Sequence, residues 1–74
     1  MNKFTKDNMT IVIKSELNAV AGTLALFEGY QTPEDRDFLK HANKSPRDRK
    51  YWNMAVAAWS CIKHDDEALG FQVK

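Results

Sequence analysis

The segment from Tyr51 to Ile62 constrains the fold of this chain more than any other part of the sequence. Ten of its twelve residues are apolar or aromatic, and only Asn53 and Ser60 are polar. At the period of an α-helix its apolar side chains point in nearly every direction, and such a helix is normally buried on several sides. The chain has only 74 residues, and a domain of that size covers only about 60% of the surface that its unfolded chain exposes.

Two similar turn signals predict where helices begin. Thr32-Pro33-Glu34-Asp35 and Ser45-Pro46-Arg47-Asp48 each place a hydroxyl side chain before proline, with an acid three residues after the hydroxyl. The hydroxyl can cap free amides, proline fits the first helical position, and the acid lies at the positive end of the helix dipole. We therefore predict one helix over about 33–43 and another over about 46–64. We expect Gly70 to end the last of these helices and to leave residues 70–74 as a C-terminal tail.

A further helix is expected over about 8–28, ended by Gly29. Five apolar residues spaced four and three apart form its main seam, namely Ile13, Leu17, Val20, Leu24 and Phe27. Val12, Ala19 and Leu26 recur every seven residues on another side. Ala21 and Ala25, with Gly22 nearby, are small enough to let a second helix approach closely.

These features predict an all-α fold, a small three-helix bundle formed by residues 1–74 as one domain. One interpretation is that the long first and third helices simply pack against each other along their length. The alternative is that one apolar stripe forms the interface of a homo-oligomer or a docking surface, since contiguous exposed apolar patches usually mark interfaces. We favour the second, a self-associating dimer, because two partner helices, one of them short, cover only part of the third.

Composition excludes several classes of protein. Eleven basic and ten acidic residues give a net charge of +1, too balanced to indicate nucleic acid or an anionic membrane as a partner. The single cysteine, Cys61, excludes a disulfide within the chain. The apolar run over 19–27 follows Glu16 and is too short to span a bilayer. A reducing, cytoplasmic location is the expectation.

No set of residues predicts catalysis, a cofactor or a metal. Cys61 and His64 are three residues apart and could begin a zinc site, but the remaining ligands of a structural site are missing. Cys61 also lies in an apolar helix interior rather than at a helix start, where thiolates are stabilised. We therefore expect no enzyme activity, because an acid, a base and the groups that position a substrate cannot all be named.

A basic segment supports a rival function. Residues 40–50 contain five basic residues and one acid, Asp48. The helix over about 33–43, the short turn after it and the helix over about 46–64 would form a helix-turn-helix in this interpretation. Arg47, Arg49 and Lys50 then stand at the start of its second helix, which in that motif meets base edges in DNA. The apolar character of that helix beyond Lys50 and the balanced net charge count against nucleic-acid binding.

The leading functional hypothesis is a non-catalytic protein–protein interaction module, acting as an adaptor, subunit or inhibitor that occupies a partner's surface. Short chains without chemistry of their own are often regulators, including inhibitors encoded by phages or mobile elements. Aromatic residues, Met and Arg are enriched at interfaces. The expected partner-binding residues are the exposed members of an apolar set with a basic rim, namely Tyr30, Arg47, Arg49, Lys50, Trp52, Met54, Val56 and Trp59.

Overall fold

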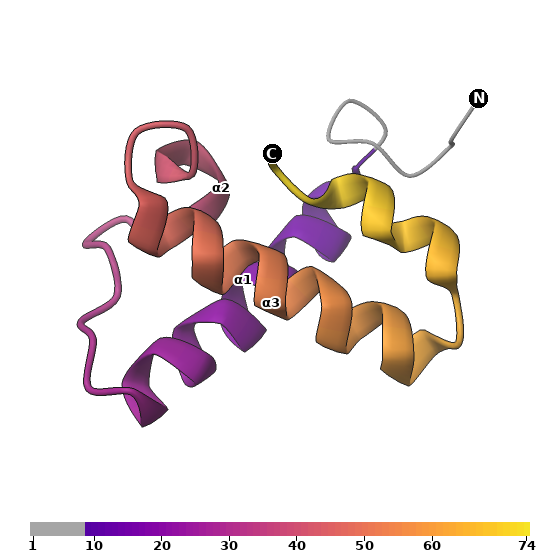
Figure 1. Ribbon diagram of the computed structural model, residues 1–74, viewed down its shortest axis with the longest axis horizontal. Coiled ribbons are helices and arrows are strands. Elements are labelled where there is room, and N and C mark those ends of the chain that lie inside the picture. The colour runs from indigo at the N-terminus through magenta and orange to yellow at the C-terminus, as the bar shows by residue number, and fades with distance from the viewer. Residues whose placement is uncertain (1–8) are drawn as a thin grey trace.

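Four helical segments and no strand make up the part of the chain that the computed structural model describes, residues 9–74. In chain order they are α1 (Ile11–Phe27), α2 (Phe38–His41), α3 (Pro46–Lys63) and the 3₁₀-helix η1 (Asp66–Phe71). The long helices α1 and α3 cross each other, α2 packs near the start of α3, and η1 turns back along α3 (Figure 1). The all-α prediction is confirmed. The predicted three-helix arrangement did not include η1, which is a fourth helical element.

Small side chains bring α1 against α3. Leu17, Ala21 and Ala25 recur every four residues on α1 and are fully buried. Two alanines in a row along this stripe let the two backbones approach closely, as their sizes indicated. Gly29, with a φ of 80°, ends the helix, and the amide of Tyr30 donates to the carbonyl of Ala25 (2.9 Å).

The buried side of α1 is rotated away from the predicted seam. Ile13, Val20 and Leu24 are only half-buried, and Phe27 is 87% exposed. The five-residue seam was therefore wrong at its C-terminal end. The alanine stripe takes its place because close contact between α1 and α3 requires small side chains.

The two turn signals behave differently. Ser45 caps α3 as predicted: its Oγ accepts from the amide of Asp48 (3.3 Å), and Pro46 occupies the first turn. The other signal starts no helix, and α2 is confined to four residues instead of spanning about 33–43. Its cap is Asp37, whose carboxylate accepts from the amide of Lys40 (3.1 Å).

Local competition for backbone amides explains the short α2. The amide of Arg36 donates to the carbonyl of Pro33 (2.8 Å), and Arg36 has a left-handed φ of 56°. Asp35 accepts from the amide of Asp37 (3.1 Å). Such side-chain and turn bonds offer the backbone an alternative to helix. The chain therefore passes through a turn before Phe38 enters the core.

The C-terminal residues are part of the core rather than a tail. α3 ends at Lys63 and is capped by His64, which takes a left-handed φ of 56°, so Gly70 is not its terminator. η1 then returns along α3 and buries Phe71 and Val73. The sequence-based tail over 70–74 was therefore wrong, because the contacts that fix this segment are distant in sequence.

Side chains of α3 hold the returning segment. The indole N–H of Trp52 donates to the carbonyl of Phe71 (2.9 Å). Asn53 pairs with the backbone of Val73 twice, accepting from its amide (2.8 Å) and donating to its carbonyl (2.7 Å). Gln72 donates to the carbonyl of Asn53 (3.0 Å). Asn53, a polar residue in the apolar part of α3, thus fixes the C-terminal residues of the chain on this helix.

This return covers most of the apolar surface of α3. Tyr51, Trp52 and Val56 are buried, and Trp59 is half-buried, while Met54 and Ile62 are exposed. The expected excess of exposed apolar surface on α3 is therefore small, because Phe71 contacts Trp52 and Trp59 while Tyr30 and Phe38 contact Tyr51.

The contrast between the two turn signals predicts unequal effects of the same kind of change. Ser45→Ala should lower the free energy of unfolding by about 1 kcal/mol, since it removes a helix cap. Thr32→Ala should cost clearly less, because Thr32 caps no helix. Urea denaturation of both variants tests this, and equal losses would contradict the structure.

The role of the C-terminal segment predicts a second contrast, between two phenylalanines. Phe71→Ala should destabilise the fold by about 3–5 kcal/mol, as for a core aromatic. Phe27→Ala should change the free energy of unfolding by less than about 0.5 kcal/mol in dilute solution, as for an exposed site. A mild effect of Phe71→Ala in urea denaturation would show that the C-terminal segment is not part of the core.

Candidate interaction surfaces

An ordered group of aromatic and basic side chains lies at the turn after α1. The rings of Tyr30 and Tyr51 stack with their centroids 5.5 Å apart, and the guanidinium of Arg47 lies 4.5 Å from the centroid of Tyr30. Lys50 Nζ lies 5.3 Å from the centroid of Tyr51. We call Tyr30, Arg47, Lys50 and Tyr51 the Tyr30 corner. Three of the predicted partner-binding residues are brought together here.

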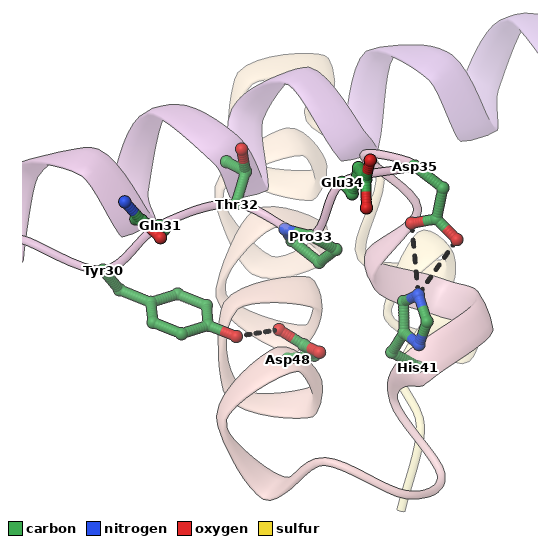
Figure 2. Close-up of a pocket in the computed structure, with 8 residues that line it drawn as sticks. All are labelled: Tyr30, Gln31, Thr32, Pro33, Glu34, Asp35, His41 and Asp48. Carbon is green, nitrogen blue, oxygen red and sulfur yellow. Dashed lines mark hydrogen bonds and ion pairs between the residues drawn. The ribbon is translucent and has the colours of Figure 1, made fainter.

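A hydrogen bond fixes the ring at the centre of this corner. The hydroxyl of Tyr30 donates to Asp48 Oδ1 (2.8 Å), as Figure 2 shows. Asp48 is itself buried. The hydrogen bond to Asp48, together with burial and the charge of Asp48, raises the pKa of Tyr30 above its usual value of about 10. The corner is therefore pre-ordered, which lowers the entropy cost of a contact made there.

A shallow hollow of about 650 Å³ borders Tyr30 and contains acidic side chains. His41 Nε2 lies 3.0 and 3.1 Å from the two carboxylate oxygens of Asp35 (Figure 2). The pKa of Asp35 is lowered, first by the amide of Asp37 that donates to it, and then by His41 and Lys40. The carboxylates of Asp35 and Asp48 in this hollow are both engaged within the chain, Asp35 by His41 and Asp48 by Tyr30.

The basic residues of segment 40–50 are largely engaged by acids or rings. Lys50 Nζ forms an ion pair with Glu28 Oε1 (3.1 Å), and Lys40 Nζ forms one with Asp35 Oδ2 (3.6 Å). A nucleic-acid interface needs cations that are free to meet phosphates. With α2 reduced to one turn, the geometry offers no observation that favours the helix-turn-helix alternative.

The expected partner-binding residues on α3 separate into core and surface. Trp52 and Val56 are fully buried and belong to the core, so they present no surface to a partner. Trp59 is half-buried, and its indole donates to the carboxylate of Glu16 (2.9 Å). Arg49 is half-buried as well, whereas Met54 remains exposed.

The largest exposed apolar surface lies on α1, outside that set. Among the described residues, four of the seven exposed large hydrophobic side chains are on this helix: Ile11 (86%), Val12 (68%), Leu26 (68%) and Phe27 (87%). Between them the helix presents small exposed residues, namely Ser15, Ala19 and Thr23. We call these seven residues the α1 face. Its sequence signal was the seven-residue repeat of Val12, Ala19 and Leu26.

None of the seven residues of the α1 face is charged, but Glu16, which is exposed, falls within the same arc of the helix. Lys14 and Glu16 are the only charged residues within α1. Lys14 Nζ is 2.9 Å from Asp37 Oδ2, and Glu16 accepts from the indole of Trp59. The hydroxyl of Thr23 donates to the carbonyl of Ala19 (3.0 Å), so its polar group is already satisfied. Lys14, Glu16 and Thr23 therefore already have partners within the chain.

Other chemistry finds little support in the geometry. Cys61 is a free, exposed thiol. Within residues 9–74, no three His, Cys, Asp or Glu side chains come together as metal ligands would. None of the helices in that range is both long and apolar enough to cross a lipid bilayer.

Comparison with known proteins adds no relative. The sequence matches no protein-family model and no curated protein, and the fold matches no solved structure. The function of the protein is therefore inferred from its α1 face and its Tyr30 corner alone.

The Tyr30–Asp48 bond predicts a pH-dependent effect of Tyr30→Phe. At neutral pH the variant should lose about 1 kcal/mol of unfolding free energy, the usual value of one hydrogen bond. Because the folded-state pKa of Tyr30 is raised, this contribution is complete below the unfolded value and is lost as the pH rises through the folded value. Urea denaturation at neutral and strongly alkaline pH should show the difference shrinking, and a constant difference would contradict it.

Proposed function

We propose that the protein is a non-catalytic interaction module that acts as an adaptor, subunit or inhibitor by covering a protein surface with its α1 face. The observation that carries this proposal is the exposure of Ile11, Val12, Leu26 and Phe27 on the side of α1 that faces away from the core. The exposed parts of these four side chains together amount to roughly 500–600 Å² of apolar surface. The largest apolar patch of an ordinary monomer is of this size or smaller. A patch of this size usually marks a contact site.

The surroundings of the α1 face support a protein as its occupant. Specific interfaces combine an apolar centre with a polar rim. Tyr30 follows Phe27 by three residues, so the Tyr30 corner begins where the α1 face ends. Tyr and Arg are the residues most often found among those that dominate binding energy. Tyr30 and Arg47 of the Tyr30 corner, which lie against each other, would supply a polar rim at the C-terminal end of α1.

The category of the protein is part of the same proposal. A free, exposed Cys61 is compatible with a reducing compartment, and a cytoplasmic location is part of the proposal. A short chain whose surface is built for contact fits a regulator, such as an inhibitor encoded by a phage or a mobile element.

Affinity capture from the native host with matched variants tests the proposal. Phe27→Asp should abolish capture of the protein that wild type retains, because a charge enters the apolar face. Ala57→Asp, at an exposed position of α3, should leave capture intact. Circular dichroism should show equal helix content in all three proteins. Capture that is insensitive to Phe27→Asp would remove the α1 face from the proposal.

A further inference from the structure

The α1 face has a symmetric pattern of side-chain sizes about Ala19. Val12 and Leu26 lie seven residues before and after Ala19, and Ile11 and Phe27 lie eight residues before and after it. Ser15 and Thr23 lie four residues to either side. Large side chains therefore stand at both ends of the helix and small ones in its middle. A surface that matches itself after a half-turn about its centre suits contact with its own copy.

We infer that the occupant of the α1 face is a second copy of this chain, packed antiparallel so that the two-fold axis passes beside Ala19. This inference rests on the proposed function, because it assigns the partner of the same face. In this arrangement Val12 of one chain lies opposite Leu26 of the second copy, and Ser15 lies opposite Thr23. A two-fold dimer buries the same patch on both chains, as closed homodimers do.

Side-chain sizes favour the antiparallel over the parallel orientation. The antiparallel pair sets the shorter Val12 against the longer Leu26 at both ends, so the two helices stay evenly spaced, while Ile11 and Phe27 lie on opposite flanks of the contact. A parallel pair would place long side chains against long ones at one end and force the helices apart there. The antiparallel orientation also brings opposite ends of the helix dipoles together.

The centre of the face has room for close contact. Shallow hollows of about 280 and 330 Å³ flank the helix there, and Ala19 and Thr23 line both of them. One of the hollows extends to Phe27 and the other to Leu26. Larger side chains of a second helix can enter such hollows while the small residues let the two backbones approach.

Area and charge agree with a weak, specific dimer. Two copies would bury on the order of 1,000–1,200 Å² of the large apolar side chains together, at the lower limit of specific interfaces. The residues that oppose each other across the axis, Val12 with Leu26 and Ser15 with Thr23, are all uncharged. The engaged hydroxyl of Thr23 adds no desolvation cost.

Sedimentation of three proteins across the micromolar range tests the occupant. Wild type should dimerise, and Ala19→Arg should raise the dissociation constant at least about 100-fold, since two cations would meet at the axis. Ala57→Arg makes the same change at an exposed position of α3 and should behave as wild type. A wild type that stays monomeric, or a dimer that Ala19→Arg leaves unchanged, would overturn the inference.

Cysteine cross-linking in a Cys61→Ser background tests the orientation without a large substitution. Ala19→Cys should form a disulfide-linked dimer on mild oxidation, at least about tenfold faster than Ala57→Cys, because the dimer raises the local thiol concentration. Ser15→Cys alone should not, since the two thiols would be about 12 Å apart along the axis, beyond the reach of a disulfide. A mixture of Ser15→Cys and Thr23→Cys chains should link as heterodimers. Rapid linking of Ser15→Cys alone would indicate a parallel pair and overturn the proposed orientation.

These results separate the two proposals. If wild type is monomeric and capture of a different protein still depends on Phe27, the second copy is wrong and the contact function stands. If dimers form and Ala19→Arg disrupts them, the second copy is confirmed whether or not another protein is captured.

Discussion

The hydrogen bonds that fix the C-terminal segment on α3 determine how the rest of the molecule presents its surface. Trp52 and Asn53 hold the backbone of Phe71 and Val73, and the side chains of Phe71 and Val73 complete the core. With this closure Tyr51, Trp52 and Val56 of α3 are enclosed. The apolar surface that stays in contact with solvent is then mainly on α1, on the side opposite to its alanine stripe.

Local signals in the sequence were sufficient for some elements. The cap at Ser45, the proline that follows it and the stop at Gly29 act through bonds within one turn, and all three appear as predicted. The pattern at Thr32 has the same composition but fails. Asp35, Arg36 and Asp37 close a turn of their own, and this competition is not visible from the cap motif alone.

Long-range contacts account for what the sequence analysis missed. The burial of Phe71 depends on residues about twenty positions earlier, and no local pattern marks it. Asn53 was a usable signal, because a polar residue inside an apolar helix needs a partner. The same closure made Trp52 and Val56 core residues rather than docking residues. The seven-residue repeat on α1 did identify the exposed stripe, although its ends, Ile11 and Phe27, were not assigned to it.

The central claim is that the outer side of α1 is a contact surface whose first occupant is a second copy of the chain. A dilution series followed by methyl NMR spectroscopy tests it most directly, because it reports each side chain separately. The account predicts that the methyl resonances of Ile11, Val12 and Leu26 shift with protein concentration while those of Met54 and Leu69 stay fixed. Resonances of the α1 face that do not change with concentration, or shifts centred on Met54 and Leu69, would contradict it.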